Sequence, residues 1–146
     1  MRLIVPLLVG CLMIAAMVLV QAVATTIIVH IMRRQVPRQP GLADWLHVVG
    51  VFTRALLVIV AAELIQVAAW AALFVGCGEF ADFPTAFYHS AVNFTTLGYG
   101  DVVMSPAWKL LGPLEAVAGM LMLGFSAAVL FAATQTLVRL RESRGV

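Results

Sequence analysis

Charged residues are scarce in this sequence. Its 146 residues include nine Lys and Arg and seven Asp and Glu, which together make 11% of the chain. A soluble globular domain has about 25% charged residues, whereas here 63% of the residues are hydrophobic. The net charge of +2 is small and no basic patch alternates with aromatic residues, so we expect no nucleic-acid partner. The composition predicts an all-α membrane protein.

Cysteine and histidine are also rare. Two cysteines, Cys11 and Cys77, exclude a disulfide framework and a zinc site by spacing. The three histidines, His30, His47 and His89, fall in different segments, and no nucleophile–base pair is apparent. We therefore expect neither an enzyme nor a bound cofactor. For Cys77 we expect a free thiol, with an intersubunit disulfide as the alternative.

Three long apolar runs predict three transmembrane helices, at residues 1–32, 48–76 and 108–138, because a span needs about 20 apolar residues. The first run also fits a secretory signal peptide cleaved near residues 22–24, but its apolar residues continue beyond that point. We therefore expect it to remain as an extra N-terminal helix. Its expected role is peripheral packing, with its hydroxyl and amide groups satisfied by the backbone or by a neighbouring helix.

Positive charge gathers in two short segments. Residues 33–47 form a basic linker that contains helix-breaking prolines, and residues 139–146 form a short basic tail. Arginines near membrane spans favour the cytoplasmic side. Three crossings then place the N-terminus outside and the C-terminus in the cytoplasm, in a cell (plasma or inner) membrane.

A shorter helix is expected at residues 84–95, where Pro84 opens it and Asp82 or Phe83 precedes it as N-cap. At 1.5 Å per residue it covers about 18 Å, which is too short to cross a bilayer. A re-entrant helix is the expected alternative. Helical spacing gives it an apolar face, formed by Phe83, Phe87, Ala91 and Phe94.

The stretch that follows, at residues 95–101, reads TTLGYGD. Its two glycines can take backbone angles that residues with a Cβ resist, so successive carbonyls can turn to one side. Four such rows around an axis would replace the hydration shell of a monovalent cation. The stretch resembles the selectivity filter of the potassium channel family, with Leu97 where the common motif has Val.

The resemblance extends over residues 48–138, which look like the pore module of bacterial potassium channels: an outer helix 48–76, a pore helix 84–95, a filter 96–101 and an inner helix 108–138. It implies a tetrameric pore. It also implies K⁺ coordination by the backbone of the filter, with the Thr96 hydroxyl adding oxygens; the K⁺ sites lie at Thr96, Leu97, Gly98 and Tyr99, and Gly100 completes the K⁺-binding filter.

The resemblance also implies residues that support the filter. Asp101 matches an aspartate that typically bonds an aromatic side chain of the pore helix. Where the family often has tryptophans, this chain has Tyr88 and His89. Thr95 is the fourth expected support residue. A carboxylate found in some members is replaced here by Val92.

The predicted spans also contain two glycines and two glutamates at positions that suggest a role in packing or gating. Gly119 and Gly124 in the third span allow close helix packing, or a gating hinge. Glu63 and Glu115 lie within spans, where an ionised carboxylate costs at least about 2.5 kcal/mol. We expect both to face protein, either as packing groups or as proton-sensitive groups.

The sequence therefore predicts a potassium-selective channel that conducts K⁺ passively. Its expected partners are K⁺, three further copies of itself and membrane lipids. A weakly selective cation channel remains an alternative, because His89 and Leu97 depart from the common pattern. The alternative from another class is a regulatory membrane subunit whose filter-like loop does not conduct.

Overall fold

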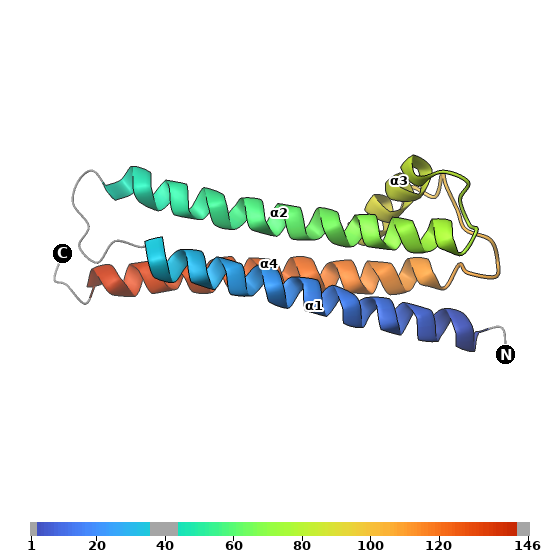
Figure 1. Ribbon diagram of the computed structural model, residues 1–146, viewed down its shortest axis with the longest axis horizontal. Coiled ribbons are helices and arrows are strands. Elements are labelled where there is room, and N and C mark those ends of the chain that lie inside the picture. Colours follow the sequence, from blue (N-terminus) through green and yellow to red (C-terminus); the bar gives the residue numbers. More distant parts are fainter. Residues whose placement is uncertain (1–2, 36–43, 143–146) are drawn as a thin grey trace.

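The computed structural model describes residues 3–35 and 44–142, and the side chains of residues 3–34 and 46–135 within them. This part of the chain contains four helices and no strand: α1 (Ile4–Gln35), α2 (Asp44–Gly76), α3 (Phe83–Phe94) and α4 (Leu111–Glu142) (Figure 1). The all-α class expected from composition is confirmed.

The helix bounds differ from the expected ones by a few residues. The second helix begins at Asp44 rather than at residue 48, and α3 begins at Phe83 rather than at residue 84. The last helix begins at Leu111 rather than at residue 108, because residues 106–110 form turns. Most of the predicted linker and the end of the predicted tail (36–43 and 143–146) lie outside the described residues.

The three long helices lie side by side, and α3 lies at one end against α2 and α4 (Figure 1). Among the described residues, three segments are long and apolar enough to span a membrane: Ile4–Arg34, Leu46–Gly76 and Leu111–Gln135. The 12 residues of α3 reach only about 18 Å. The expected arrangement of three spans and one short helix is confirmed.

The start of α3 is fixed by its N-cap. Asp82 has an extended backbone, and its carboxylate accepts hydrogen bonds from the Thr85 N–H and hydroxyl, both at 2.9 Å. Pro84 occupies the first turn, where its missing N–H costs no hydrogen bond. A second contact holds the adjoining loops, because the Glu79 carboxylate accepts from the Ser105 N–H and hydroxyl at 2.6 Å each.

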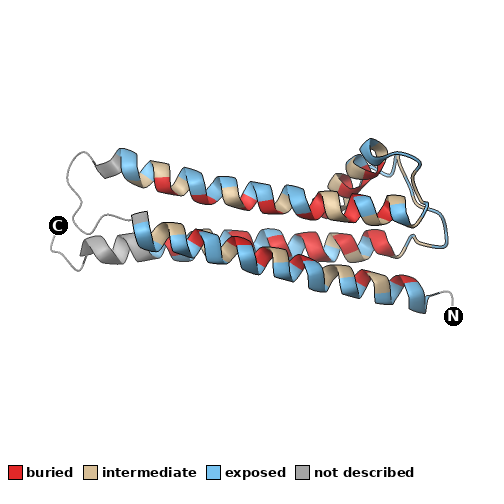
Figure 2. Ribbon diagram, viewed as in Figure 1, coloured by how far each residue is buried: buried red, intermediate tan, exposed pale blue. Residues whose placement is uncertain are grey.

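Buried residues gather where α2, α3 and α4 meet (Figure 2). Trp70, Phe74, Phe94 and Leu111 are each at most 1% exposed there. The buried face of α3 overlaps only in part with the apolar face expected from the spacing, because Phe94 is buried while Phe87 and Ala91 are only partly buried. Phe83 is 46% exposed, while the buried residues of this helix are Ala86, His89, Ser90, Val92 and Phe94. The polar members of that set bond to neighbouring segments, and these bonds decide which face turns inward.

The extra helix α1 is tied to both long helices of the predicted pore module by polar side chains. Gln21 donates to the Ser126 hydroxyl at 2.8 Å and accepts from Gln66 at 3.0 Å. Ser126 donates in turn to Glu63 at 2.7 Å. Thr25 bonds the backbone carbonyl of Gln21 at 2.8 Å. The expectation that polar groups of α1 are satisfied by backbone and neighbouring helices is confirmed at these positions.

Two glycines of α4 differ sharply in their surroundings. A Cβ at Gly119 would collide with the backbone carbonyl of Phe94, at the end of α3. Nothing lies within 4 Å of the corresponding position at Gly124. The absence of a side chain at Gly119 therefore lets α4 approach the last turn of α3, whereas the described residues make no such contact at Gly124.

This contrast gives a prediction for stability. Gly119→Ala should destabilise the folded protein by about 1–3 kcal/mol, the usual cost of overpacking a well-packed core. Gly124→Ala is the matched control in the same helix, and it should leave stability equal or slightly higher. Thermal unfolding in detergent, followed by tryptophan fluorescence, measures both. Equal melting temperatures for the two variants would contradict the close approach at Gly119.

Candidate functional site

The TTLGYGD loop leaves the last turn of α3 and is held to it by backbone hydrogen bonds. The Thr96 N–H donates to the Asn93 carbonyl at 2.8 Å. The N–H groups of Leu97 and Gly98 both donate to the Val92 carbonyl, at 2.9 and 3.3 Å. The C-terminal carbonyls of the helix, which have no partners inside the helix, thus take up the donors of the loop.

The backbone of the loop alternates in handedness. Thr96, Gly98 and Gly100 have φ values of 60°, 62° and 72°, and no other residue of the loop has a positive φ. Such alternation turns successive N–H groups to one side and successive carbonyls to the other, unlike a β-strand, in which they alternate. Among the described residues, no backbone N–H bonds the carbonyls of residues 96–100. These carbonyls are available to a cation.

Thr96 takes a conformation that the sequence did not reveal. A residue with a branched Cβ at positive φ is unusual, and such a backbone costs about 1–3 kcal/mol. The bonds that the Asn93 and Val92 carbonyls accept from Thr96 and its neighbours hold this strained conformation in place. Thr95 closes the helix, since its hydroxyl donates to the Ala91 carbonyl at 2.7 Å.

At the C-terminal end of the loop, the Tyr88 hydroxyl donates to the Asp101 carboxylate at 2.7 Å. This is the aromatic–aspartate contact that the sequence comparison with the channel family led us to expect, with tyrosine as the donor. The hydrogen bond favours the ionised carboxylate, so it lowers the pKa of Asp101 and raises the pKa of Tyr88. The contact ties the pore helix to the end of the loop.

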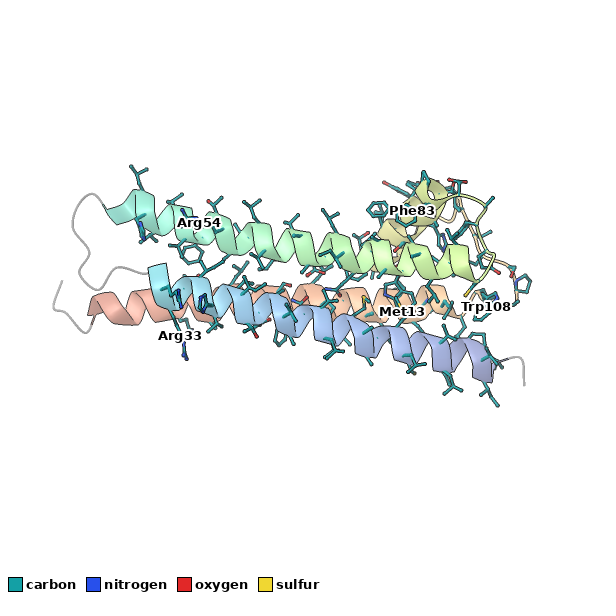
Figure 3. All side chains as sticks on the ribbon, viewed as in Figure 1. Met13, Arg33, Arg54, Phe83 and Trp108 are labelled. Atoms are coloured by element: carbon teal, nitrogen blue, oxygen red, sulfur yellow. The ribbon has the colours of Figure 1, made fainter. Side chains whose placement is uncertain are left out.

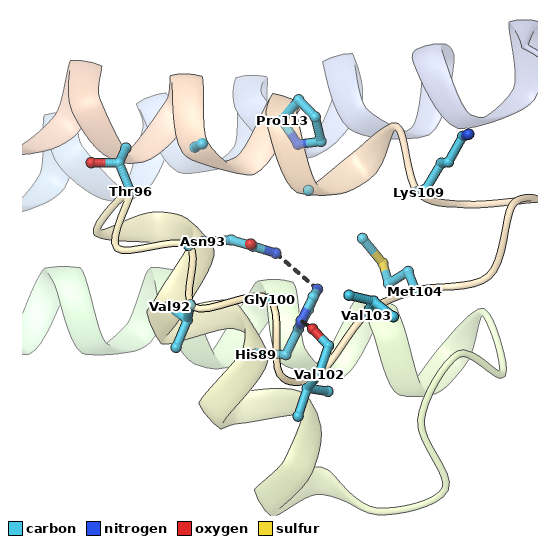
Figure 4. A pocket seen from close by; sticks show the side chains of 13 residues that line it. His89, Val92, Asn93, Thr96, Gly100, Val102, Val103, Met104, Lys109 and Pro113 are labelled. Atoms are coloured by element: carbon cyan, nitrogen blue, oxygen red, sulfur yellow. Dashed lines mark hydrogen bonds between the residues drawn. The ribbon is translucent and has the colours of Figure 1, made fainter.

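His89 makes a second contact between α3 and the end of the loop. Its Nδ1 lies 2.9 Å from the Val102 carbonyl, and its Nε2 lies 2.8 Å from Asn93 Nδ2 (Figure 4). The ring is buried, with 6% of its surface exposed, and it packs against the rings of Phe74 and Phe80, which also contact each other. The two expected support residues of α3 therefore contact consecutive residues at the end of the loop: Tyr88 contacts Asp101, and His89 contacts Val102.

Glu115 of α4 contacts α3 at Ser90. Ser90 Oγ lies 2.5 Å from Glu115 Oε1 and 2.8 Å from the Val67 carbonyl. A hydroxyl has one proton, and the Val67 carbonyl can only accept it. The Ser90 hydroxyl can therefore make both contacts only when Glu115 is protonated and donates to it. Three elements, α2, α3 and α4, meet at this one hydroxyl.

The sequence-predicted residues fall into separate groups. Thr95, Asp101, Tyr88 and His89 lie around the loop, while Glu63 lies farther along the helices, where it bonds Ser126. Both glutamates face protein, as expected. A proton-sensitive role for either, and a hinge at Gly119 or Gly124, stay predictions. Cys11 and Cys77 are free thiols, and an intersubunit disulfide at Cys77 stays a prediction too.

Several contributing residues were missed from the sequence: Ser90, Asn93, Gln66, Ser126 and the Glu79–Ser105 pair. A signal for two of them was present, because Ser90 and Asn93 interrupt an apolar helix on the side that carries His89. Polar side chains within a membrane commonly bond across helices.

The Tyr88 contact gives a pH-dependent prediction. Tyr88→Phe removes the donor that stabilises the ionised form, so the pKa of Asp101 should rise toward its ordinary value. Tyr99→Phe, which removes a neighbouring hydroxyl that has no bond to Asp101, is the control. Carboxyl ¹³C NMR titration of the labelled protein measures the change. An unshifted Asp101 in Tyr88→Phe would show that the contact does not hold the carboxylate.

Comparison with known proteins agrees with this geometry. The sequence model of a family described as ion channel matches residues 48–136, which include α3, the loop and most of α2 and α4. No curated protein and no solved structure matches the chain. The matched segment covers more than half of the 146 residues. The chain therefore belongs to the ion channel family.

Proposed function

We propose that this chain forms a potassium-selective channel in which K⁺ passes through the carbonyls of residues 96–99. One observation carries the proposal: the backbone alternates between positive and negative φ through the TTLGYGD loop. The N–H groups of Leu97 and Gly98 are used on the helix side. Carbonyls on the other side can replace water around a dehydrated monovalent cation.

The pore helix supports the same function electrostatically. Its C-terminal end, which carries a partial negative charge, lies at the start of the loop. That charge favours a cation near the inner end of the filter. The bonds from Tyr88 to Asp101 and from His89 to Val102 support the outer end. Two anchors on one helix favour a filter of fixed width, and hence selectivity over weakly selective conduction.

Four copies of the chain are needed to complete the site. One loop supplies a single row of carbonyls, and a row on one side cannot surround an ion. Non-helical backbone at membrane depth must be enclosed by protein or line water. Leu97 and Tyr99 are 55% and 66% exposed in the single chain. We propose that neighbouring copies cover these side chains around a four-fold axis.

The proposed orientation follows from charge. Arg33 and Arg54 lie at one end of the helices, and Phe83 and Trp108 lie at the other, beside the loop (Figure 3). The positive-inside rule puts the arginine end in the cytoplasm. The filter then faces the outside of a cell (plasma or inner) membrane, and the first helix starts outside.

Selectivity can be tested by flux into liposomes that contain the purified protein. K⁺ should permeate far better than Na⁺, and Ba²⁺, with a similar size and twice the charge, should block. Gly98→Ala should abolish K⁺ flux, because a Cβ is strained at its φ of 62°. Gly78→Ala is the matched control, since Gly78 has a φ of 74° outside the loop.

Equal K⁺ and Na⁺ flux would contradict potassium selectivity. Absence of any ion flux from the folded protein would favour the regulatory-subunit alternative. Loss of flux in Gly78→Ala as well as in Gly98→Ala would show that glycine strain in general, rather than the filter, accounts for the effect.

Assembly gives an independent prediction. The detergent-solubilised particle should have the protein mass of four chains, each of 15.7 kDa. Native mass spectrometry measures this directly, after the detergent is removed in the gas phase. A particle of one, two or three chains under conditions that preserve flux would contradict the four-fold arrangement.

A further inference from the structure

His89 is a titratable side chain of α3 whose ring joins the segment after the loop, at Val102, to Asn93 of its own helix. Nδ1 faces the Val102 carbonyl at 2.9 Å, and Nε2 faces the Asn93 amide nitrogen at 2.8 Å. A carbonyl can only accept, so Nδ1 must carry a proton. An amide nitrogen can only donate, so Nε2 must be the acceptor. These two contacts specify a neutral ring with its proton on Nδ1.

Protonation of Nε2 would turn this acceptor into a donor that faces the donor on Asn93. The contact is restored only if the amide rotates and presents its oxygen. Each charge state of His89 therefore has its own orientation of Asn93. A cavity of about 520 Å³ borders both residues; its lining includes Gly98, Gly100, Val102 and Gly112 (Figure 4).

Asn93 is also joined to the start of the filter. Its backbone carbonyl accepts the Thr96 N–H at 2.8 Å. A Cβ at Gly112 of α4 would lie 3.3 Å from the side-chain nitrogen of Asn93, so the amide packs closely on that helix. The pair His89 and Asn93 thus contacts the backbone on both sides of the filter, at Thr96 and at Val102.

The surroundings of His89 contain charges of both signs. The carboxylates of Asp101 and Glu79 interact electrostatically with the ring. Lys109 lines the same cavity. Glu115 lies beside Asn93. Burial is the largest influence and lowers the pKa of His89, while the Val102 bond, Asp101 and Glu79 act in the opposite direction. The ring is therefore neutral near pH 7 and takes up a proton in acid.

We infer that His89 and Asn93 are a positioning pair for the filter and that protonation of His89 from the Asp101 side of the membrane reduces K⁺ conduction. This inference rests on the proposed conduction of K⁺. Protonation changes no bond within the filter itself. It breaks the donor–acceptor match that fixes Asn93, and the change reaches Thr96 through the backbone of the same residue.

The test compares K⁺ flux at about pH 7.5 and about pH 5, imposed on the Asp101 side of liposomes in which the channel has one orientation. The parent should lose flux at the lower pH, in proportion to the fraction of His89 that is protonated. His89→Asn should keep a ratio near one between the two values, because an Asn amide nitrogen can still donate to Val102 but does not titrate. Asn93→Asp offers a carboxylate to Nε2–H, which should raise the midpoint by about one pH unit or more.

A second measurement does not depend on conduction. ¹⁵N NMR of the labelled protein, with His89→Asn to identify the signal, should show the Nδ1–H neutral form at neutral pH. The opposite tautomer, a charged ring at neutral pH, a parent flux independent of pH, or a His89→Asn variant with the parent's pH response would each overturn the inference. A parent that carries no K⁺ at pH 7.5 contradicts the proposed function instead, and the NMR result still decides the state of His89.

Discussion

The structure depends on one constraint, which is that the last turn of α3 accepts the backbone N–H groups of Thr96, Leu97 and Gly98 at the start of the TTLGYGD loop. The Val92 carbonyl takes the N–H groups of Leu97 and Gly98, and the alternating φ values then turn the carbonyls away. This requires the last turn of α3 to stay fixed. Close packing of Gly119 against Phe94 fixes it from α4, and the Asp82 cap fixes the first turn. The long helices therefore hold α3 where its last turn can accept the N–H groups of the loop.

Within this apolar scaffold, a few polar side chains specify how the helices pack. Burial of apolar surface discriminates poorly between helix faces in a membrane, because lipid tails are as apolar as side chains. Hydrogen bonds do discriminate, since a polar group without a partner in hydrocarbon costs several kcal/mol, roughly. Ser90 joins α3 to α2 and to Glu115 of α4. Gln21 joins α1 to the same two long helices. The extra helix is thus attached to the inner helix at Ser126, two residues beyond Gly124.

The number of spans, the short helix and the place of its N-terminal cap could be predicted from the sequence, because each leaves a local signal such as an apolar run or a Pro near a helix start. The Gly-Tyr-Gly stretch predicted a filter for K⁺, and that role stays a prediction. The face of α3 that turns inward was predicted only in part: hydrophobic spacing selected Phe94, which is buried, but also Phe83, which is 46% exposed. It missed His89 and Ser90, which are buried and make polar contacts with neighbouring segments. The positive φ of Thr96 was also hidden, since β-branched residues normally avoid that conformation. Partners of Gln21 and Glu115 lie 105 and 25 residues away, so only the packed structure reveals them.

The central claim is that the carbonyls of residues 96–99 bind K⁺ along an axis shared by several copies of the chain. The most direct measurement is a crystal structure of the assembled protein, with Rb⁺ or Tl⁺ in place of K⁺ so that anomalous scattering locates the ions. The account predicts a row of anomalous peaks on the symmetry axis, each between successive rings of these carbonyls. An axis without ions, or carbonyls that point away from it while the protein still conducts, would contradict the account.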